Sequence, residues 1–129
     1  MKIYIASRYE NKEAIRELAK VLKVERFKIV STWHKEKYDP DIQIENLTPA
    51  RMRTLSLRDL TEIESCNALL IYTDGCNQSR GGMHFENGYA FANDKKIYII
   101  GPRITIFHYL PGVEQFETVG DFLAEVPND

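Results

Sequence analysis

The sequence has little cysteine and no long apolar run. Its two cysteines, Cys66 and Cys76, are too few for a disulfide framework and lack the CxxC spacing of zinc and redox sites. No apolar stretch approaches the roughly 18 residues that a membrane-spanning helix needs, and no signal-peptide pattern precedes Met1. We therefore expect a soluble, cytoplasmic protein with no membrane partner.

A surplus of charge of one sign is also lacking. Lysine and arginine number 17 against 19 aspartates and glutamates, which gives a formal net charge of -2. That balance argues against a nucleic acid polymer or an anionic membrane as the main partner, because both favour a basic surface. A small phosphorylated ligand is compatible with it, since one or two arginines suffice to bind a phosphate. Neither a P-loop nor a GxGxxG motif occurs, so triphosphate and dinucleotide binding lack support.

The 129 residues, 43% of them apolar and 28% charged, fit one globular domain spanning 1–129. Apolar periodicity and turn signals predict five strands, at about 2–6, 27–32, 68–72, 97–100 and 116–118. Helices are predicted after a cap at Asn11, and at about 49–65, 83–93 and 120–126. This alternation predicts an α/β fold, a doubly wound Rossmann- or flavodoxin-like parallel sheet with helices on both faces.

Ligands of such sheets bind at the carboxyl ends of the strands. Those ends carry four segments, at 7–9, 32–34, 74 onward and 101–103. Trp33, the single tryptophan, lies in the second of them, where it either stacks on a base or packs in the core. His34 and His108 also fall in predicted loops, where each either contacts the ligand or is solvated, and solvated histidines are expected.

One carboxylate lies in an unexpected place on the helix predicted at 49–65. When this helix is wound at about 100° per residue, Asp59 falls within its apolar stripe, which consists of Met52, Leu55, Leu60 and Ile63. A buried carboxylate is costly unless it is paired or hydrogen-bonded. Two interpretations are open: an ion pair with a neighbouring strand or with Arg103, or a carboxylate that faces the ligand cleft.

A second carboxylate, Glu86, closely follows Gly81 and Gly82 at the start of a predicted helix. A helix amino terminus favours a negative charge and is expected to keep this side chain ionised. The glycines allow a ligand to approach closely. Glu86 is therefore either an acid that complements the helix dipole or a nucleophile of the kind used in retaining glycoside chemistry. Because Asp59 comes from another helix, one acid can attack while the other handles the proton.

Three segments together resemble a known family: Met1 to Ser7, an aspartate on the helix before the third strand, and Gly81 to Ala90. The sharpest part runs from Glu86 to Ile100, where a Glu-x-Gly-Tyr-Ala helix precedes a lysine-rich turn and a strand. In these features the chain resembles the nucleoside 2-deoxyribosyltransferase superfamily, which includes the related hydrolases of nucleoside 5'-monophosphates. The likeness extends from Met1 to about the last helix.

The resemblance implies cleavage of the N-glycosidic bond of a (deoxy)nucleoside through a glycosyl-enzyme intermediate on Glu86. It gives Asp59 the task of orienting the ligand and helping to protonate the leaving base. The residues that line the sugar and any phosphate are then Tyr4, Ser7, Arg8 and Tyr9. No metal or organic cofactor is implied. A homodimer or larger homo-oligomer is implied, in which a neighbour's residue closes the site; Phe107, Tyr109 and Leu110 are interface candidates, or else they cap the core.

The chain departs from the family pattern six residues before Glu86. Transferases that act on free nucleosides commonly carry an aspartate there, and the monophosphate hydrolases a serine that contacts phosphate. This chain has Arg80, with Ser79 beside it. A guanidinium suits phosphate because it offers a planar fork of donors, although a solvated loop arginine is the other interpretation. The departure favours a phosphorylated substrate, with Ser7 and Arg8 as further phosphate contacts.

Two other functions are compatible with parts of the sequence. His84-Phe85-Glu86 matches the His-x-Glu of zinc nucleobase deaminases, but the downstream Pro-Cys-x-x-Cys that completes their zinc site is missing. The second rival is a non-catalytic module of the same fold that holds a nucleotide or ADP-ribose-like ligand. The presence of both Asp59 and Glu86 argues for catalysis, since binding alone has no need of a nucleophile. The sequence leaves open the base, the sugar and the acceptor.

Overall fold

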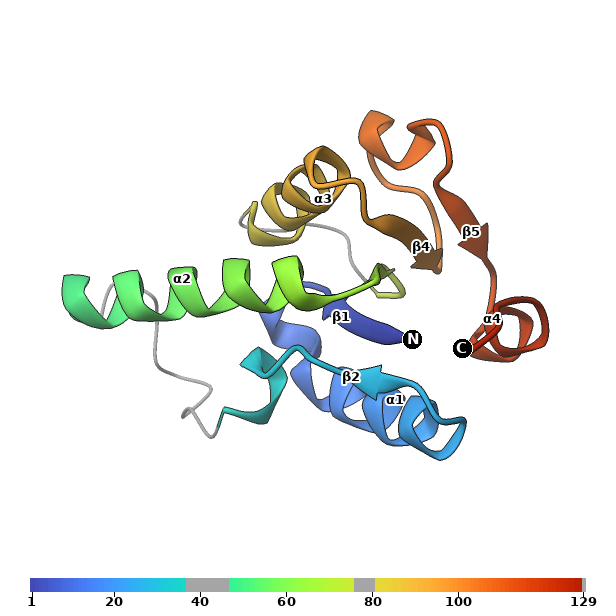
Figure 1. Ribbon diagram of the computed structural model, residues 1–129, viewed down its shortest axis with the longest axis horizontal. Helices are drawn as coiled ribbons and strands as arrows, with labels where there is room; N and C mark the ends of the chain where they lie inside the picture. Colours follow the sequence, from blue (N-terminus) through green and yellow to red (C-terminus); the bar gives the residue numbers. More distant parts are fainter. Residues whose placement is uncertain (37–46, 76–80, 129) are drawn as a thin grey trace.

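The computed structural model describes residues 1–36, 47–75 and 81–128. Within these ranges one parallel sheet forms, with the strand order β2-β1-β3-β4-β5 (Figure 1). The strands are β1 (Lys2–Ala6), β2 (Lys28–Ile29), β3 (Ala68–Tyr72), β4 (Lys96–Ile100) and β5 (Glu114–Phe116). Because the chain winds outward in both directions from β1 and β3, their carboxyl ends mark the topological switch point, where ligands of such sheets bind.

Helices cover both faces of this sheet. They are α1 (Lys12–Val24), α2 (Pro49–Ser65), α3 (Gly82–Ala92) and α4 (Val119–Glu125). In Figure 1, α2 and α3 lie together on one side of the strands, and α1 and α4 lie on the other. The predicted doubly wound α/β sheet is thus confirmed. None of the helices in the described part of the chain is long and apolar enough to cross a membrane.

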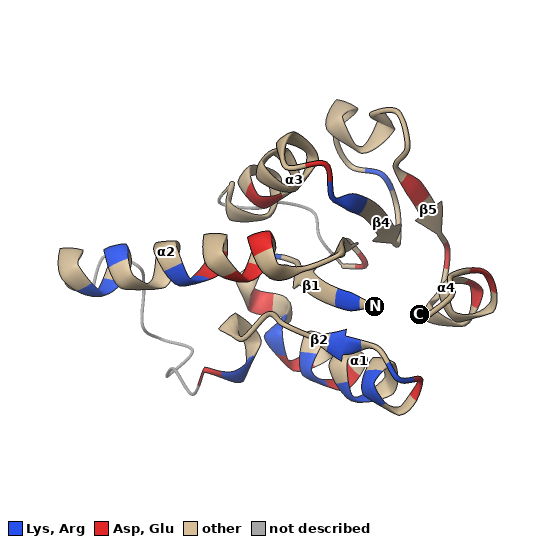
Figure 2. Ribbon diagram, viewed as in Figure 1, with Lys and Arg blue, Asp and Glu red and all other residues tan. Residues whose placement is uncertain are grey.

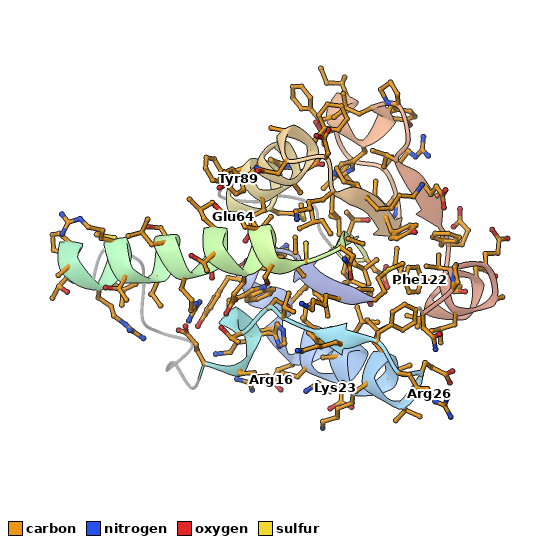
Figure 3. The ribbon with its side chains drawn as sticks, in the orientation of Figure 1. Arg16, Lys23, Arg26, Glu64, Tyr89 and Phe122 are labelled. Carbon is orange, nitrogen blue, oxygen red and sulfur yellow. The ribbon has the colours of Figure 1, made fainter. Side chains whose placement is uncertain are left out.

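The core divides into two layers because side chains alternate along the strands. On the α4 side, the buried Phe122 packs its ring edge-on against Tyr98, with 5.5 Å between the ring centroids, and also contacts Phe27 (Figure 3). On the α2 and α3 side, Tyr4 and its neighbour Leu69 on β3 point away from this aromatic group. Tyr4 is fully buried beneath the two helices that carry the candidate acids.

The second strand is shorter than the predicted 27–32. After Val30 donates its N–H to the Ile3 carbonyl, the next bond of the ladder is made by a side chain: the Ile5 N–H donates to the Ser31 hydroxyl at 3.1 Å. A hydroxyl that replaces a backbone carbonyl ends the regular pairing. Asn11 precedes α1 as predicted, but its side chain does not cap the helix; its amide donates to Ser7 and to the Asp74 carbonyl instead.

Candidate active site

Three carboxylates carried by helices and one tyrosine form the candidate site on the α2 and α3 side of the sheet. Tyr4 comes from β1, Asp59 and Glu62 from α2, and Glu86 from α3. The Tyr4 hydroxyl donates a hydrogen bond to the Glu86 carboxylate. Figure 2 shows that basic residues lie toward the start of α2 and acidic ones toward its end, which is the end that contacts β1 and α3. The two acids chosen from the sequence are therefore neighbours in space.

Glu86 is held mainly in its protonated form near neutral pH. Burial raises the pKa of its carboxyl to about 8; the hydrogen bond from Tyr4 acts against this rise, while the negative charges of Asp59 and Glu62 add to it. The prediction that the helix terminus keeps Glu86 ionised is wrong. Glu86 is the fifth residue of α3, so it lies beyond the first turn, and desolvation outweighs the weak helix dipole at that position.

Asp59 is partly buried, with 28% of its side chain exposed. Burial raises the pKa of its carboxyl, and Arg58, whose guanidinium lies 3.0 Å from it, acts in the opposite direction. Arg58 also forms an ion pair with Glu36. The predicted pairing with Arg103 is wrong, because that guanidinium lies over the Tyr109 ring, 4.8 Å from its centroid. Arg58 is thus the cation that pairs with Asp59, which lies among the candidate carboxylates.

Glu62 is a site residue that the sequence reasoning missed. Both of its carboxylate oxygens accept hydrogen bonds from Thr32, at 3.0 Å from the backbone N–H and 2.7 Å from the hydroxyl. Its position three residues after Asp59 places the two carboxylates one turn apart on the same face of α2. That spacing is a signal which winding the helix reveals, but nothing in the sequence identifies Thr32 as the partner.

The residues after β1 and β2 lie at the predicted carboxyl edge of the sheet, but several of their polar groups form hydrogen bonds or ion pairs with other groups of the protein. The Ser7 hydroxyl donates to the Tyr72 carbonyl at 2.7 Å, and Arg8 forms an ion pair with Glu10. Trp33 is buried, and its indole N–H donates to the Ile5 carbonyl at 2.7 Å, as in the packing interpretation. Tyr9 is partly exposed beside Trp33.

Gly81 precedes α3 with a φ of 100°, in the left-handed region where a side chain would be strained. Among the described residues, no atom lies within 4 Å of a Cβ placed at Gly81 or Gly82, so these residues leave room beside the start of α3. The two phosphate candidates next to it in the chain, Ser79 and Arg80, lie outside the described residues.

The prediction that His34 and His108 are solvated is wrong, because both side chains are buried. His34 shares a hydrogen bond with the Ser31 hydroxyl at 3.0 Å, and His108 accepts one from the Ile104 N–H at 3.1 Å. Burial lowers the pKa of each imidazole to about 4, so both are neutral at pH 7. In the described ranges no three histidine, cysteine or acidic side chains are grouped so as to hold a metal ion.

Replacing Tyr4 by phenylalanine should make Glu86 still harder to ionise. Tyr4→Phe removes the hydrogen bond that lowers the pKa of Glu86 and leaves its burial unchanged. The titration midpoint of the Glu86 carboxyl should then move upward by about 1 to 2 pH units, the value of a hydrogen bond to a charged group. Carbon-13 NMR of labelled glutamate, assigned with Glu86→Gln, measures it. An unchanged midpoint would contradict the role given to Tyr4.

The fold is shared with two solved enzymes. Over 96% of both chains it matches the CMP N-glycosidase BcmB of Clostridium botulinum, with a TM-score of 0.62 and 17% sequence identity. It also matches a 2-deoxyribosyltransferase of Bacillus psychrosaccharolyticus with a TM-score of 0.65 and 18% identity, over 95% of this chain and 90% of that one. Both activities belong to the superfamily that the sequence resembles. No family model matches the chain. No curated protein matches it either.

Proposed function

We propose that the protein cleaves the N-glycosidic bond of a nucleoside or its 5'-monophosphate and passes the sugar to water or to another base. The observation that carries this proposal is the partly buried Glu86, which accepts a hydrogen bond from Tyr4 and whose pKa is raised by burial and by the nearby charge of Asp59. Two neighbouring carboxyls, one for attack and one for proton transfer, are what double displacement at an anomeric carbon requires.

In the first step the Glu86 carboxylate attacks the anomeric carbon, and the bond from that carbon to the base nitrogen breaks. The electron pair leaves with the base, which takes a proton from the Asp59 carboxyl. In the second step water or an incoming base attacks the anomeric carbon, and the bond from that carbon to the Glu86 oxygen breaks. The Asp59 carboxylate accepts the proton that the attacking molecule loses. Two inversions retain the anomeric configuration. The positive charge that develops on the sugar favours the anionic form of Glu86 once substrate is bound.

We propose a 5'-monophosphate as the preferred substrate. The support is the position of Gly81 and Gly82 at the start of α3, because the amino terminus of a helix suits an anion. Arg8 and Ser7 at the end of β1, and Ser79 with Arg80 just before α3, are the proposed phosphate contacts. No metal or organic cofactor takes part in this scheme.

Chromatography of released base tests the proposal. The protein is incubated with ribo- and deoxynucleosides and their 5'-monophosphates, each with and without a second base. Release from monophosphates in water alone makes the protein a hydrolase, whereas release that requires the second base makes it a transferase. If no substrate turns over although nucleotides bind, the rival interpretation holds: a module that binds a nucleotide or ADP-ribose-like ligand without cleaving it.

We also propose that two copies associate through α3 and the short helix η4 (Ile106–Tyr109). Phe85 is 62% exposed and stacks on Tyr89, and Ile106 is 78% exposed. The two elements adjoin, because the rings of His84 and His108 lie 6.1 Å apart. Exposed apolar side chains on two adjoining elements favour an interface. Light scattering should give twice the 15.0 kDa chain mass for the wild type, and one chain mass for Phe85→Asp with Ile106→Asp.

A further inference from the structure

Both carboxylate oxygens of Glu62 accept hydrogen bonds from the loop that follows β2. Its two oxygens accept from the N–H and the hydroxyl of one residue, Thr32. The loop is itself fixed, since Arg16 of α1 donates to the carbonyls of His34, at 2.5 Å, and Glu36, at 2.9 Å. The negative charge of Glu62 is therefore held in one place, and its oxygens are occupied by protein donors.

The charge of Glu62 reaches each member of the catalytic group. It raises the pKa of Glu86 on α3, of Asp59 on its own helix and of Tyr4 on β1. The cation that faces this group is Arg58, which lies on Asp59 and Glu36. Glu62 is thus held by hydrogen bonds from the loop, whereas the carboxyls of Asp59 and Glu86 titrate as a coupled pair.

We propose that Glu62 is a positioning residue whose fixed charge sets the pH range in which the Asp59 and Glu86 pair carries a single proton. This inference rests on the proposed function. In the reaction Glu86 must be anionic to attack and Asp59 must hold a proton for the leaving base. Activity therefore requires one proton on the pair, and its pH profile is a bell whose two limbs report the loss of the first and the second proton.

Removing the charge of Glu62 should move the whole bell toward acid pH. Glu62→Gln lowers the tendency of both carboxyls to keep their protons, so kcat/KM on the acid limb should rise about three- to tenfold, with a matching loss on the alkaline limb. Glu64→Gln is the matched control: it removes the same charge two residues further along α2, where Glu64 accepts from Tyr89 at the surface (Figure 3). Its bell should not move.

A gain of activity on the acid limb is an outcome that a merely structural role cannot produce. A bell that stays in place, or one that falls equally at every pH, would overturn the proposal. If Glu62→Gln does not fold, the double variant Thr32→Val with Glu62→Gln replaces it, since the one amide oxygen of glutamine can accept from the backbone N–H of residue 32, which is then the single remaining donor of that residue to Glu62. The same acid shift is expected of that variant.

The inference is separable from the proposed function. If the wild type releases no base from any substrate, the proposed function fails while the Glu86 carboxyl can still be titrated by carbon-13 NMR. In Glu62→Gln its midpoint should lie at lower pH than in the wild type, and in Glu64→Gln at the wild-type position. An unmoved midpoint in a folded Glu62→Gln protein would overturn the charge effect itself.

Discussion

Replacing Glu86 by glutamine is expected to lower the rate of base release at least about a thousandfold. Glutamine keeps the length of the side chain, and its amide oxygen can still accept the hydrogen bond from the Tyr4 hydroxyl. It lacks the anionic oxygen that attacks the anomeric carbon. Single-turnover assays that follow free base by chromatography measure the loss directly. Asp59→Asn should cost about a hundredfold, because proton transfer to the leaving base contributes less than the nucleophile.

Two further measurements separate chemistry from binding in the Glu86→Gln protein. Its affinity for a nucleotide, measured by calorimetry, should stay within a few-fold of the wild type, since the site is otherwise intact. Mass spectrometry of the acid-quenched wild type should detect a glycosyl adduct that the variant lacks. Glu114→Gln on the exposed surface of β5 serves as the matched control and should behave as the wild type. A Glu86→Gln protein that retains the wild-type rate would contradict the nucleophile assignment.

The layered fold follows from the sequence because its strongest signals are local. The apolar run at 68–72 and the proline after Thr48 both predict their elements at the observed bounds, and the Thr48 hydroxyl accepts from the Arg51 N–H as a capping residue should. The second strand was less predictable. Its early end at Ile29 depends on a Ser31 hydroxyl that takes a partner from β1, and such a contact has no local signature.

The candidate site was predictable only in part. Winding α2 identifies Asp59 as a carboxylate on an apolar face, and the same procedure applied three residues further would have marked Glu62. The partners of both acids were not predictable. Arg58 adjoins Asp59 in the sequence, where helical geometry directs neighbouring side chains apart, and Thr32 reaches Glu62 from the loop after β2. These contacts depend on how separate elements pack.

The ionisation of Glu86 could not be predicted from helix position. The dipole of α3 is a local effect of a few tenths of a kcal/mol to about 1 kcal/mol, whereas the desolvation comes from burial in the fold, where α3 packs against α2 and β1. The solvated state expected for His34 and His108 was wrong for the same reason. In each case tertiary burial overrides what a residue's place in a loop or helix suggests.

Burial of Glu86 should make the protein less stable as pH rises, and Glu86→Gln should remove that loss. The pKa of this carboxyl is about 8 when folded, against an ordinary value of 4.5, so between these values the folded state holds more protons than the unfolded state. The free energy of unfolding therefore falls as pH rises from about 4.5 to 8. Above pH 8 the variant should exceed the wild type by a few kcal/mol, on the order of the pKa difference converted to free energy.

The comparison of the two proteins isolates Glu86 from groups that titrate in the same interval. His34 and His108 have pKa values lowered to about 4, so they favour the folded state increasingly as pH rises from about 4 toward their ordinary value of 6.5. These imidazoles act against Glu86 in the wild type, but they are common to both proteins and cancel in the difference. Urea unfolding at pH 5, 7 and 9 gives that difference at each pH.

The stability difference should be small at pH 5, intermediate at pH 7 and largest at pH 9. Such a rise would mean that the fold tolerates a carboxylate that destabilises it, at the position where the proposed reaction needs a nucleophile. Stabilising substitutions that impair activity are common at catalytic positions for this reason. A difference that does not change with pH would instead mean that Glu86 ionises as readily in the folded protein as in the unfolded chain, and the case for a desolvated nucleophile would be lost.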